Sequence, residues 1–172
     1  MAEADREALD ALYSAAYEEL RRLAACVSGE EGRGTLNPTA LANEAWLKLA
    51  ASPHLRWSSQ LHFKRIAARA MRQVLVEAAR RRAAGKRGGA ASLVTFDDAL
   101  EERTADARQV LAIDEALHDL ARLSPRQALM VESRFFGGMD IPETARLLQV
   151  SEATVQRDWR AARAWLAREL RR

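Results

Sequence analysis

The chain has 172 residues, of which 48% are hydrophobic and 30% charged, with a net charge of +3. This length suits one medium domain or two small ones, and eight Gly with four Pro exclude a loop-rich or low-complexity chain. A single cysteine, Cys26, excludes an internal disulfide. The acidic N-terminus and the lack of a long apolar run predict no signal peptide, no membrane insertion and a cytoplasmic protein. Alanine, leucine and arginine dominate while strand formers are sparse, which predicts an all-α fold.

Charge is distributed in four blocks along the chain. Residues 1–52 sum to −4, residues 53–89 to +9, residues 90–119 to −6 and residues 120–172 to +4. Two basic blocks separated by an acidic one indicate two sites for a polyanion and a linker that avoids it.

The first predicted helix runs from about Asp5 to Val27 and keeps one face apolar. After a glycine-rich break, Asn37 and Pro38 form an N-cap followed by Pro at the first helical position. The helix they open carries side chains that are left partly outward, namely Asn43, Glu44, Trp46 and Lys48. Because Trp is enriched at interfaces, this face predicts a partner surface, although Trp46 could instead pack against the first helix.

The third predicted helix spans about residues 60–83 and has one continuous apolar face. Another face is basic and contains Arg65, Arg69, Arg72 and Arg80, with Lys64 nearby. A solvated basic face would normally be mixed with acids, yet Glu77 is the one acid between residues 53 and 89. The sequence therefore predicts that one face packs and the other binds nucleic-acid phosphates.

A linker is predicted over residues 85–109, where the sequence turns from basic to acidic. Two further helices follow, one over about residues 110–123 and one from Pro125 to Phe136. The second is opened by Ser124 as N-cap, and two glycines end it.

The stretch from Gly137 to Leu170 holds two helical patterns on either side of a short break. Asp140 can cap the first with Glu143 reaching back, and Ser151 can cap the second, which runs to the end of the chain. The inward stripe of the second helix consists of Val155, Trp159, Ala162 and Leu166. A different face presents Ala153, Gln156, Arg157 and Arg160. Gln pairs with adenine and Arg with guanine or phosphate in the major groove, so we predict a helix-turn-helix. The alternative is a helical hairpin with solvated arginines.

Signatures of catalysis or cofactor binding are missing from the sequence. The three histidines, His54, His62 and His118, form no metal-ligand spacing with Cys26. There is no P-loop, no dinucleotide fingerprint and no nucleophile elbow. We therefore expect no enzymatic activity, no metal and no cofactor.

Three stretches resemble bacterial sigma factors of the extracytoplasmic-function (ECF) group, and together they cover nearly the whole chain. They are TLNPTALANEAWLKL, HFKRIAARAMRQVLVEAARRRAAGKRGG and LSPRQALMVESRFFGGMDIPETARLLQVSEATVQRDWRAARAWL. Their Pro-Thr-Ala-Leu, Lys-Arg-Gly-Gly and Arg-Asp-Trp signatures look like one subset of the group. The resemblance implies two small helical domains. Sigma region two would occupy residues 1–84, the linker residues 85–109, and sigma region four residues 110–172, with its helix-turn-helix.

The resemblance also implies partners and site residues. Core RNA polymerase would be bound by Asn43, Glu44, Trp46, Leu47 and Lys48. The minus-ten element would be melted and held by Arg56, Trp57, Ser58, Lys64, Arg65, Arg69, Arg72 and Arg80, with Trp57 able to stack on an unstacked base. The minus-thirty-five element would be read by Ser151, Ala153, Thr154, Gln156, Arg157 and Arg160.

Three residues depart from the pattern of the group. Gln149 stands where the turn commonly has Gly, at a cost of about 1 kcal/mol if its φ is positive. Thr144 and Ser133 stand at positions that are usually aliphatic and buried. Two other functions remain open: a stand-alone helix-turn-helix regulator, and a sigma mimic that sequesters an anti-sigma partner. Three means of restraining the activity are left open: an anti-sigma protein, a partner kinase, or control of synthesis.

Overall fold

The structure, a computed structural model, describes residues 14, 15, 17, 18, 20–22, 24, 37–51, 59–85 and 107–172. Its helices are α2 (Pro38–Ala50), α3 (Gln60–Gly85), α5 (Ala107–Leu123), α6 (Pro125–Phe135), α7 (Ile141–Leu148) and α8 (Glu152–Glu169). The described residues between 14 and 24 are also helical, and the described ranges contain no strand. The predicted all-α class is confirmed. The predicted linker lies almost wholly outside the described residues.

The helices begin where the sequence predicted caps. Asn37, Ser124, Asp140 and Ser151 each accept a hydrogen bond from a backbone N–H in the first turn of the helix that follows. Asp140 and Glu143 complete a capping box, because the Glu143 side chain in turn accepts from the Asp140 N–H at 3.1 Å. The four predicted N-caps are therefore confirmed.

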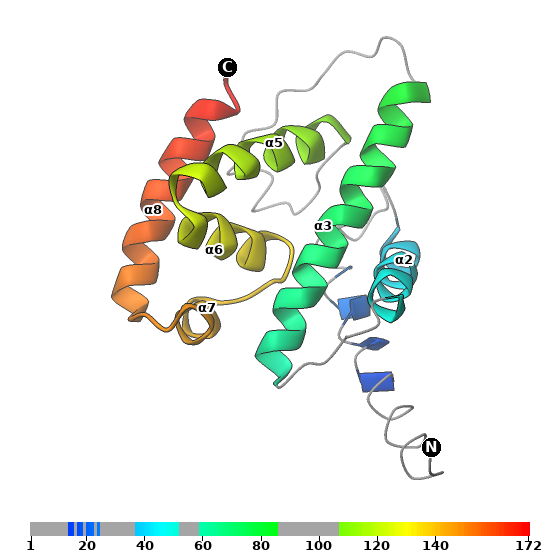
Figure 1. Ribbon diagram of the computed structural model, residues 1–172, viewed down its shortest axis with the longest axis horizontal. Coiled ribbons are helices and arrows are strands. Elements are labelled where there is room, and N and C mark those ends of the chain that lie inside the picture. Colours follow the sequence, from blue (N-terminus) through cyan, green and yellow to red (C-terminus); the bar gives the residue numbers. More distant parts are fainter. Residues whose placement is uncertain are drawn as a thin grey trace.

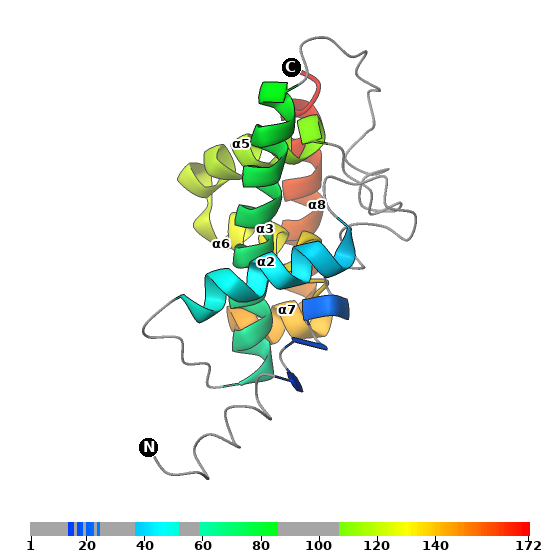
Figure 2. The same cartoon turned by 90° about the vertical axis from the view of Figure 1, so that its right-hand side faces the viewer.

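Helix α3 is the central element of the fold (Figure 1). It packs against α2 on one side and against α5, α6 and α7 on the other, and α8 covers α6 and α7. Seen from the side, α2 crosses α3 while the later helices lie behind it (Figure 2). We refer to residues 107–172, which include α5 to α8, as the C-terminal half.

One continuous core joins α3 to both of its neighbours. The cluster contains fully buried side chains from five helices, including Leu41, Met71, Ile113, Met130 and Leu166. The two predicted domains thus share an apolar core in this conformation. The assignment of residues 1–84 and 110–172 to separate sigma regions stays a prediction.

The two polar residues that the sequence placed at core positions are indeed buried. Thr144 and Ser133 both have no exposed surface. Thr144 Oγ1 donates a hydrogen bond to the Asp140 carbonyl at 2.6 Å, so its hydroxyl is satisfied. Ser133 Oγ has no hydrogen-bond partner among the described residues. A buried hydroxyl without a partner loses its hydration without compensation.

Gln149 adopts the left-handed conformation that the sequence flagged at the turn between α7 and α8. It caps the C-terminus of α7 with φ 54° and ψ 46°, and its N–H faces the carbonyls of Ala145 and Arg146. Glycine is the residue that adopts this conformation without steric cost. We therefore expect Gln149→Gly to raise the free energy of unfolding by about 1 kcal/mol, measured by urea denaturation. Gln149→Ala is the control, because it keeps Cβ and should give no such gain. An equal gain from both variants would contradict this account.

Candidate polymerase and nucleic-acid interfaces

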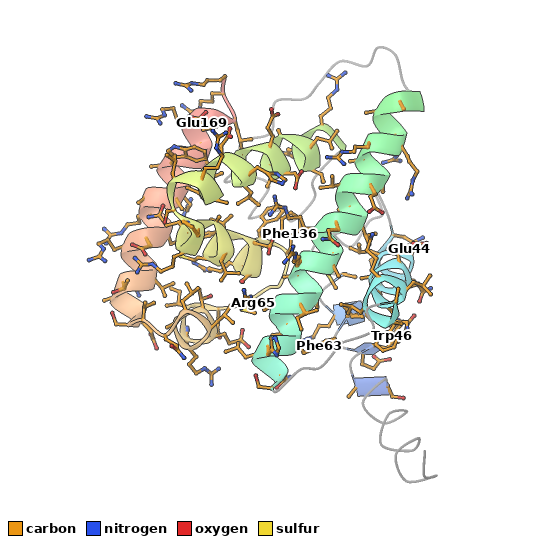
Figure 3. All side chains as sticks on the ribbon, in the orientation of Figure 1. Glu44, Trp46, Phe63, Arg65, Phe136 and Glu169 are labelled. Atoms are coloured by element: carbon orange, nitrogen blue, oxygen red, sulfur yellow. The ribbon has the colours of Figure 1, made fainter. Side chains whose placement is uncertain are left out.

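The outer face of α2 carries an exposed apolar side chain. Leu47 is 61% exposed, whereas Leu41, Ala45 and Leu49 on the opposite face are buried. Trp46 is half-buried and packs against the core, and its role at a partner surface stays a prediction. Figure 3 shows Glu44 on the side of α2 that faces away from α3.

Two polar residues of the same surface are fixed by neighbours. Asn43 Oδ1 accepts a hydrogen bond from the Tyr17 hydroxyl at 2.6 Å, which ties α2 to the preceding helical residues. Lys48 Nζ pairs with Glu77 of α3 at 2.8 Å. The five residues predicted to bind polymerase thus lie on one helix, and at least two of them have their orientation set by a hydrogen bond.

The basic residues of α3 divide into two groups in the structure. Arg65, Arg69 and Arg80 are exposed and line an open groove between α3, α5 and α6. Figure 3 shows Arg65 on the side of α3 opposite Phe63, which is buried. Lys64 and Arg72 are less exposed and pair with carboxylates of the C-terminal half.

Arg72 is surrounded by hydrogen-bond acceptors from two helices. Its Nε donates to Asp114 Oδ1 at 2.8 Å and its Nη1 to Glu132 Oε2 at 2.7 Å, while Nη2 donates to the Asp114 carbonyl at 3.2 Å. Lys64 is 7% exposed and its ammonium pairs with Glu143 of α7. In this conformation these two cations are therefore engaged by carboxylates of the C-terminal half.

Helices α7 and α8 are joined by a three-residue turn, and α8 has two distinct faces. Val155, Ala162 and Leu166 are buried, and Trp159 is half-buried beside them. The predicted DNA face is exposed to solvent over its whole length, at Ala153, Gln156, Arg157 and Arg160. Ser151 and Thr154 have a capping role as well, because Ser151 Oγ accepts from the Thr154 N–H at 3.1 Å.

A family model for ECF sigma factors matches the chain over residues 1–172. The chain belongs to the ECF sigma factor family. Its role is thus that of a sigma factor in transcription initiation. Searches of curated proteins and of solved structures found no match.

One contact in this sigma factor was missed by the sequence analysis. Arg134 of α6 lies over the Trp159 ring of α8, with its guanidinium carbon 4.1 Å from the ring centroid. Burial lowers the pKa of Arg134, and Arg163 adds to this effect while Asp140 opposes it. Its Nε and Nη1 are buried without a hydrogen-bond partner among the described residues. This cation–π contact holds α8 against α6. The sequence did not predict it, because a single arginine in a helical pattern does not indicate which aromatic ring it will meet.

The base-capturing loop of the sigma factor stays a prediction, because Arg56, Trp57 and Ser58 lie outside the described residues. Among the residues that the structure does describe, no group of His, Cys, Asp and Glu is arranged to hold a metal ion. The described part of the chain also contains no helix with the length and apolarity that a membrane crossing needs.

Proposed function

We propose that this sigma factor binds core RNA polymerase through α2, holds the minus-ten strand with α3 and the loop at Arg56–Ser58, and reads the minus-thirty-five element with α8. Residues 1–84 would then act as sigma region two and residues 110–172 as sigma region four, with residues 85–109 as the linker. The observation that carries the proposal is the face of α8 that is exposed next to a tight turn, while the opposite face is buried.

The exposed face of α8 has the chemistry of a recognition helix. Such a helix places its N-terminal residues against base edges in the major groove. Gln156 offers an amide that suits adenine, and Arg157 offers a guanidinium that suits guanine or phosphate. Both side chains are exposed, and the side chain of Arg157 is 69% exposed.

The α3 surface supports the minus-ten assignment through its charge. Arg65, Arg69 and Arg80 present three exposed guanidinium groups along one groove, where Glu77 is the one exposed acid of α3. Phosphate contacts of this kind supply sequence-independent affinity that falls as salt rises. Base stacking in the neighbouring loop would add about 1–3 kcal/mol per base.

The test is in-vitro transcription with core bacterial RNA polymerase, the purified chain and a pool of upstream DNA fragments from its own genome. Discrete transcripts that require the chain would support the proposal and identify its promoters. Binding to core polymerase without any transcript would instead favour a sigma mimic that sequesters an anti-sigma protein. Failure to bind core polymerase would contradict the proposal and favour a stand-alone DNA-binding regulator.

The exposed leucines allow a matched test of the polymerase surface. Leu47 on α2 and Leu123 at the end of α5 are 61% and 69% exposed, and both can be replaced by Ser. We expect Leu47→Ser to weaken binding to core polymerase by roughly tenfold, as loss of an apolar contact of about 1–2 kcal/mol predicts. Leu123→Ser should leave binding unchanged. Both variants should keep their stability within about 0.5 kcal/mol, since neither side chain is buried. Titration of the labelled chain with core polymerase measures the difference in affinity. Equal affinities for the two variants would contradict the assignment of α2 to the interface.

A further inference from the structure

Glu152 is the one exposed acid of α8, and the DNA contacts proposed above do not include it. It is the first residue of the helix. The other two acids of α8 are less accessible, because Asp158 is 7% exposed and the side chain of Glu169 is 18% exposed. Glu152 thus places a carboxylate on the same exposed surface as Arg157 and Arg160.

The carboxylate of Glu152 has no hydrogen bond or ion pair with any residue that the structure describes. Side chains three and four positions further along a helix are the ones that could pair with it, and these are the buried Val155 and the neutral Gln156. Glu152 is not in the capping-box position either, since that position of α8 is occupied by Thr154. The structural role that is left to it is the general attraction between an acid and a helix N-terminus.

Glu152 lies beside a side chain that is proposed to read a base. Gln156 is one turn further along α8 on the same side of the helix, and both residues are exposed. A recognition helix places its N-terminal residues against base edges, and Glu152 is closer to the N-terminus than Gln156. Four residues span about 6 Å of helix, and base pairs are about 3.4 Å apart. A base edge that meets Glu152 is therefore expected about two base pairs from the one that meets Gln156.

A carboxylate in the major groove distinguishes the four bases by their hydrogen-bonding groups. An ionised carboxylate accepts hydrogen bonds and donates none. Guanine and thymine present acceptors in this groove, and adenine presents an acceptor beside its donor, whereas cytosine presents its N4 amino group without an acceptor. The phosphates repel a carboxylate, so the DNA backbone offers it no favourable contact. Cytosine is thus the base that suits Glu152 best.

We infer that Glu152 is a specificity-determining residue of this sigma factor, and that it accepts a hydrogen bond from the N4 amino group of a cytosine in the minus-thirty-five element. The inference rests on the proposed function and deepens it, because it names the base that one further residue reads. Arg157 and Arg160 attract DNA of any sequence through its phosphates. Glu152 acts in the opposite direction, because it lowers the affinity for duplexes that lack the cytosine.

The test is a selection from randomised duplex DNA, carried out with the full chain alone and with the chain bound to core polymerase. The test variant is Glu152→Gln, which keeps the size of the side chain and removes its charge. The control variant is Glu115→Gln on α5, which removes the same charge from another exposed acid without a partner among the described residues. Circular dichroism verifies that each variant is folded.

We expect the unsubstituted chain and the control variant to prefer cytosine at one position on the order of tenfold over the other bases, as one good base contact predicts. Glu152→Gln should shift this preference to adenine, because an amide pairs with N6 and N7 of adenine. A duplex in which adenine replaces that cytosine should therefore bind Glu152→Gln more tightly than it binds the unsubstituted chain.

Two alanine variants separate base reading from a purely structural role. Glu152→Ala should lose the preference for cytosine and still bind unrelated duplex DNA at least as tightly as the unsubstituted chain, because a carboxylate that repels phosphates is gone. Gln156→Ala should relax a position about two base pairs away. If Glu152 only stabilised the helix, its loss would weaken binding to all duplexes and leave the base preferences unchanged.

Three outcomes would overturn the inference. The first is an identical set of base preferences for Glu152→Gln and the unsubstituted chain. The second is a position that depends on Glu152 and prefers a base other than cytosine. The third is a selection that enriches no sequence with or without polymerase, because α8 would then read no bases. A chain that selects DNA but does not bind polymerase would contradict the proposed function, whereas the contact with cytosine would still be decided by the same base preferences.

Discussion

Replacing Phe136 by Ala is expected to lower the free energy of unfolding by about 3–5 kcal/mol, the usual loss for a buried Phe. Phe136 has no exposed surface and is among the largest fully buried side chains. It follows the last residue of α6, where its N–H donates to the Glu132 carbonyl at 3.0 Å. Figure 3 shows it between α6 and α3, so the cavity would open where the two halves meet.

The neighbouring ring provides the control for this prediction. Phe135 packs edge-on against Phe136 at a centroid distance of 4.8 Å, but it is only half-buried. Phe135→Ala should therefore cost clearly less than Phe136→Ala. Urea unfolding followed by circular dichroism measures both losses. If the free energy of unfolding falls with urea concentration at an unchanged slope, the folded and unfolded states have kept their compactness. Equal losses from the two variants would mean that Phe136 is not part of a core shared by both halves.

The sequence predicted the local structure well because caps and apolar stripes are encoded by neighbouring residues. Asp140 and Glu143 lie three positions apart, and their capping box follows from that spacing. The left-handed Gln149 was indicated instead by the family resemblance, because it stands where the turn commonly has Gly. The exposed face of α8 also followed from its 3.6-residue period.

The long-range contacts were not predictable in the same way. The acids that pair with Arg72 belong to helices with an amphipathic pattern, in which an acid is expected to face solvent. Glu77 was the one acid near the basic helix in sequence, and it pairs with Lys48 of α2. The burial of Lys64 and the position of Arg134 over Trp159 depend on how helices pack, which periodicity does not specify.

The ion pairs of Lys64 and Arg72 give the proposed minus-ten and minus-thirty-five surfaces different expected behaviour. Lys64 and Arg72 are paired with carboxylates in the free chain, whereas Gln156 and Arg157 on α8 are exposed. If the proposed function holds, substitutions on α8 act on promoter binding directly. Substitutions at Lys64 or Arg72 also remove ion pairs between helices, so we expect them to change the stability of the fold as well as DNA binding.

Replacing Arg157 by Ala is expected to lower promoter-directed transcription roughly five- to 150-fold at limiting sigma factor. This range corresponds to the loss of about 1–3 kcal/mol that follows removal of one base-contacting arginine. The fold should be retained, because Arg157 Nε is 3.7 Å from Asp158 while Arg126 holds the same carboxylate at 2.6 Å. Unfolding measured in urea should therefore change by no more than about 0.5 kcal/mol.

Arg168→Ala is the matched control for this prediction. Arg168 lies on the same helix, its side chain is 65% exposed, and it makes a similarly loose contact of 3.6 Å with Glu169. It is in the last turn of α8, away from the N-terminal residues that a recognition helix places in the groove. Equal activity of the two variants would refute the recognition-helix assignment.

Arg157→Lys then separates base contact from phosphate contact, because it keeps the charge but loses the bidentate geometry that reads guanine. If Arg157 reads a base, the Lys variant should lose promoter selectivity. If Arg157 binds phosphate, the Lys variant should keep most activity, and the Ala variant should reduce the salt dependence of promoter binding by about one unit of slope.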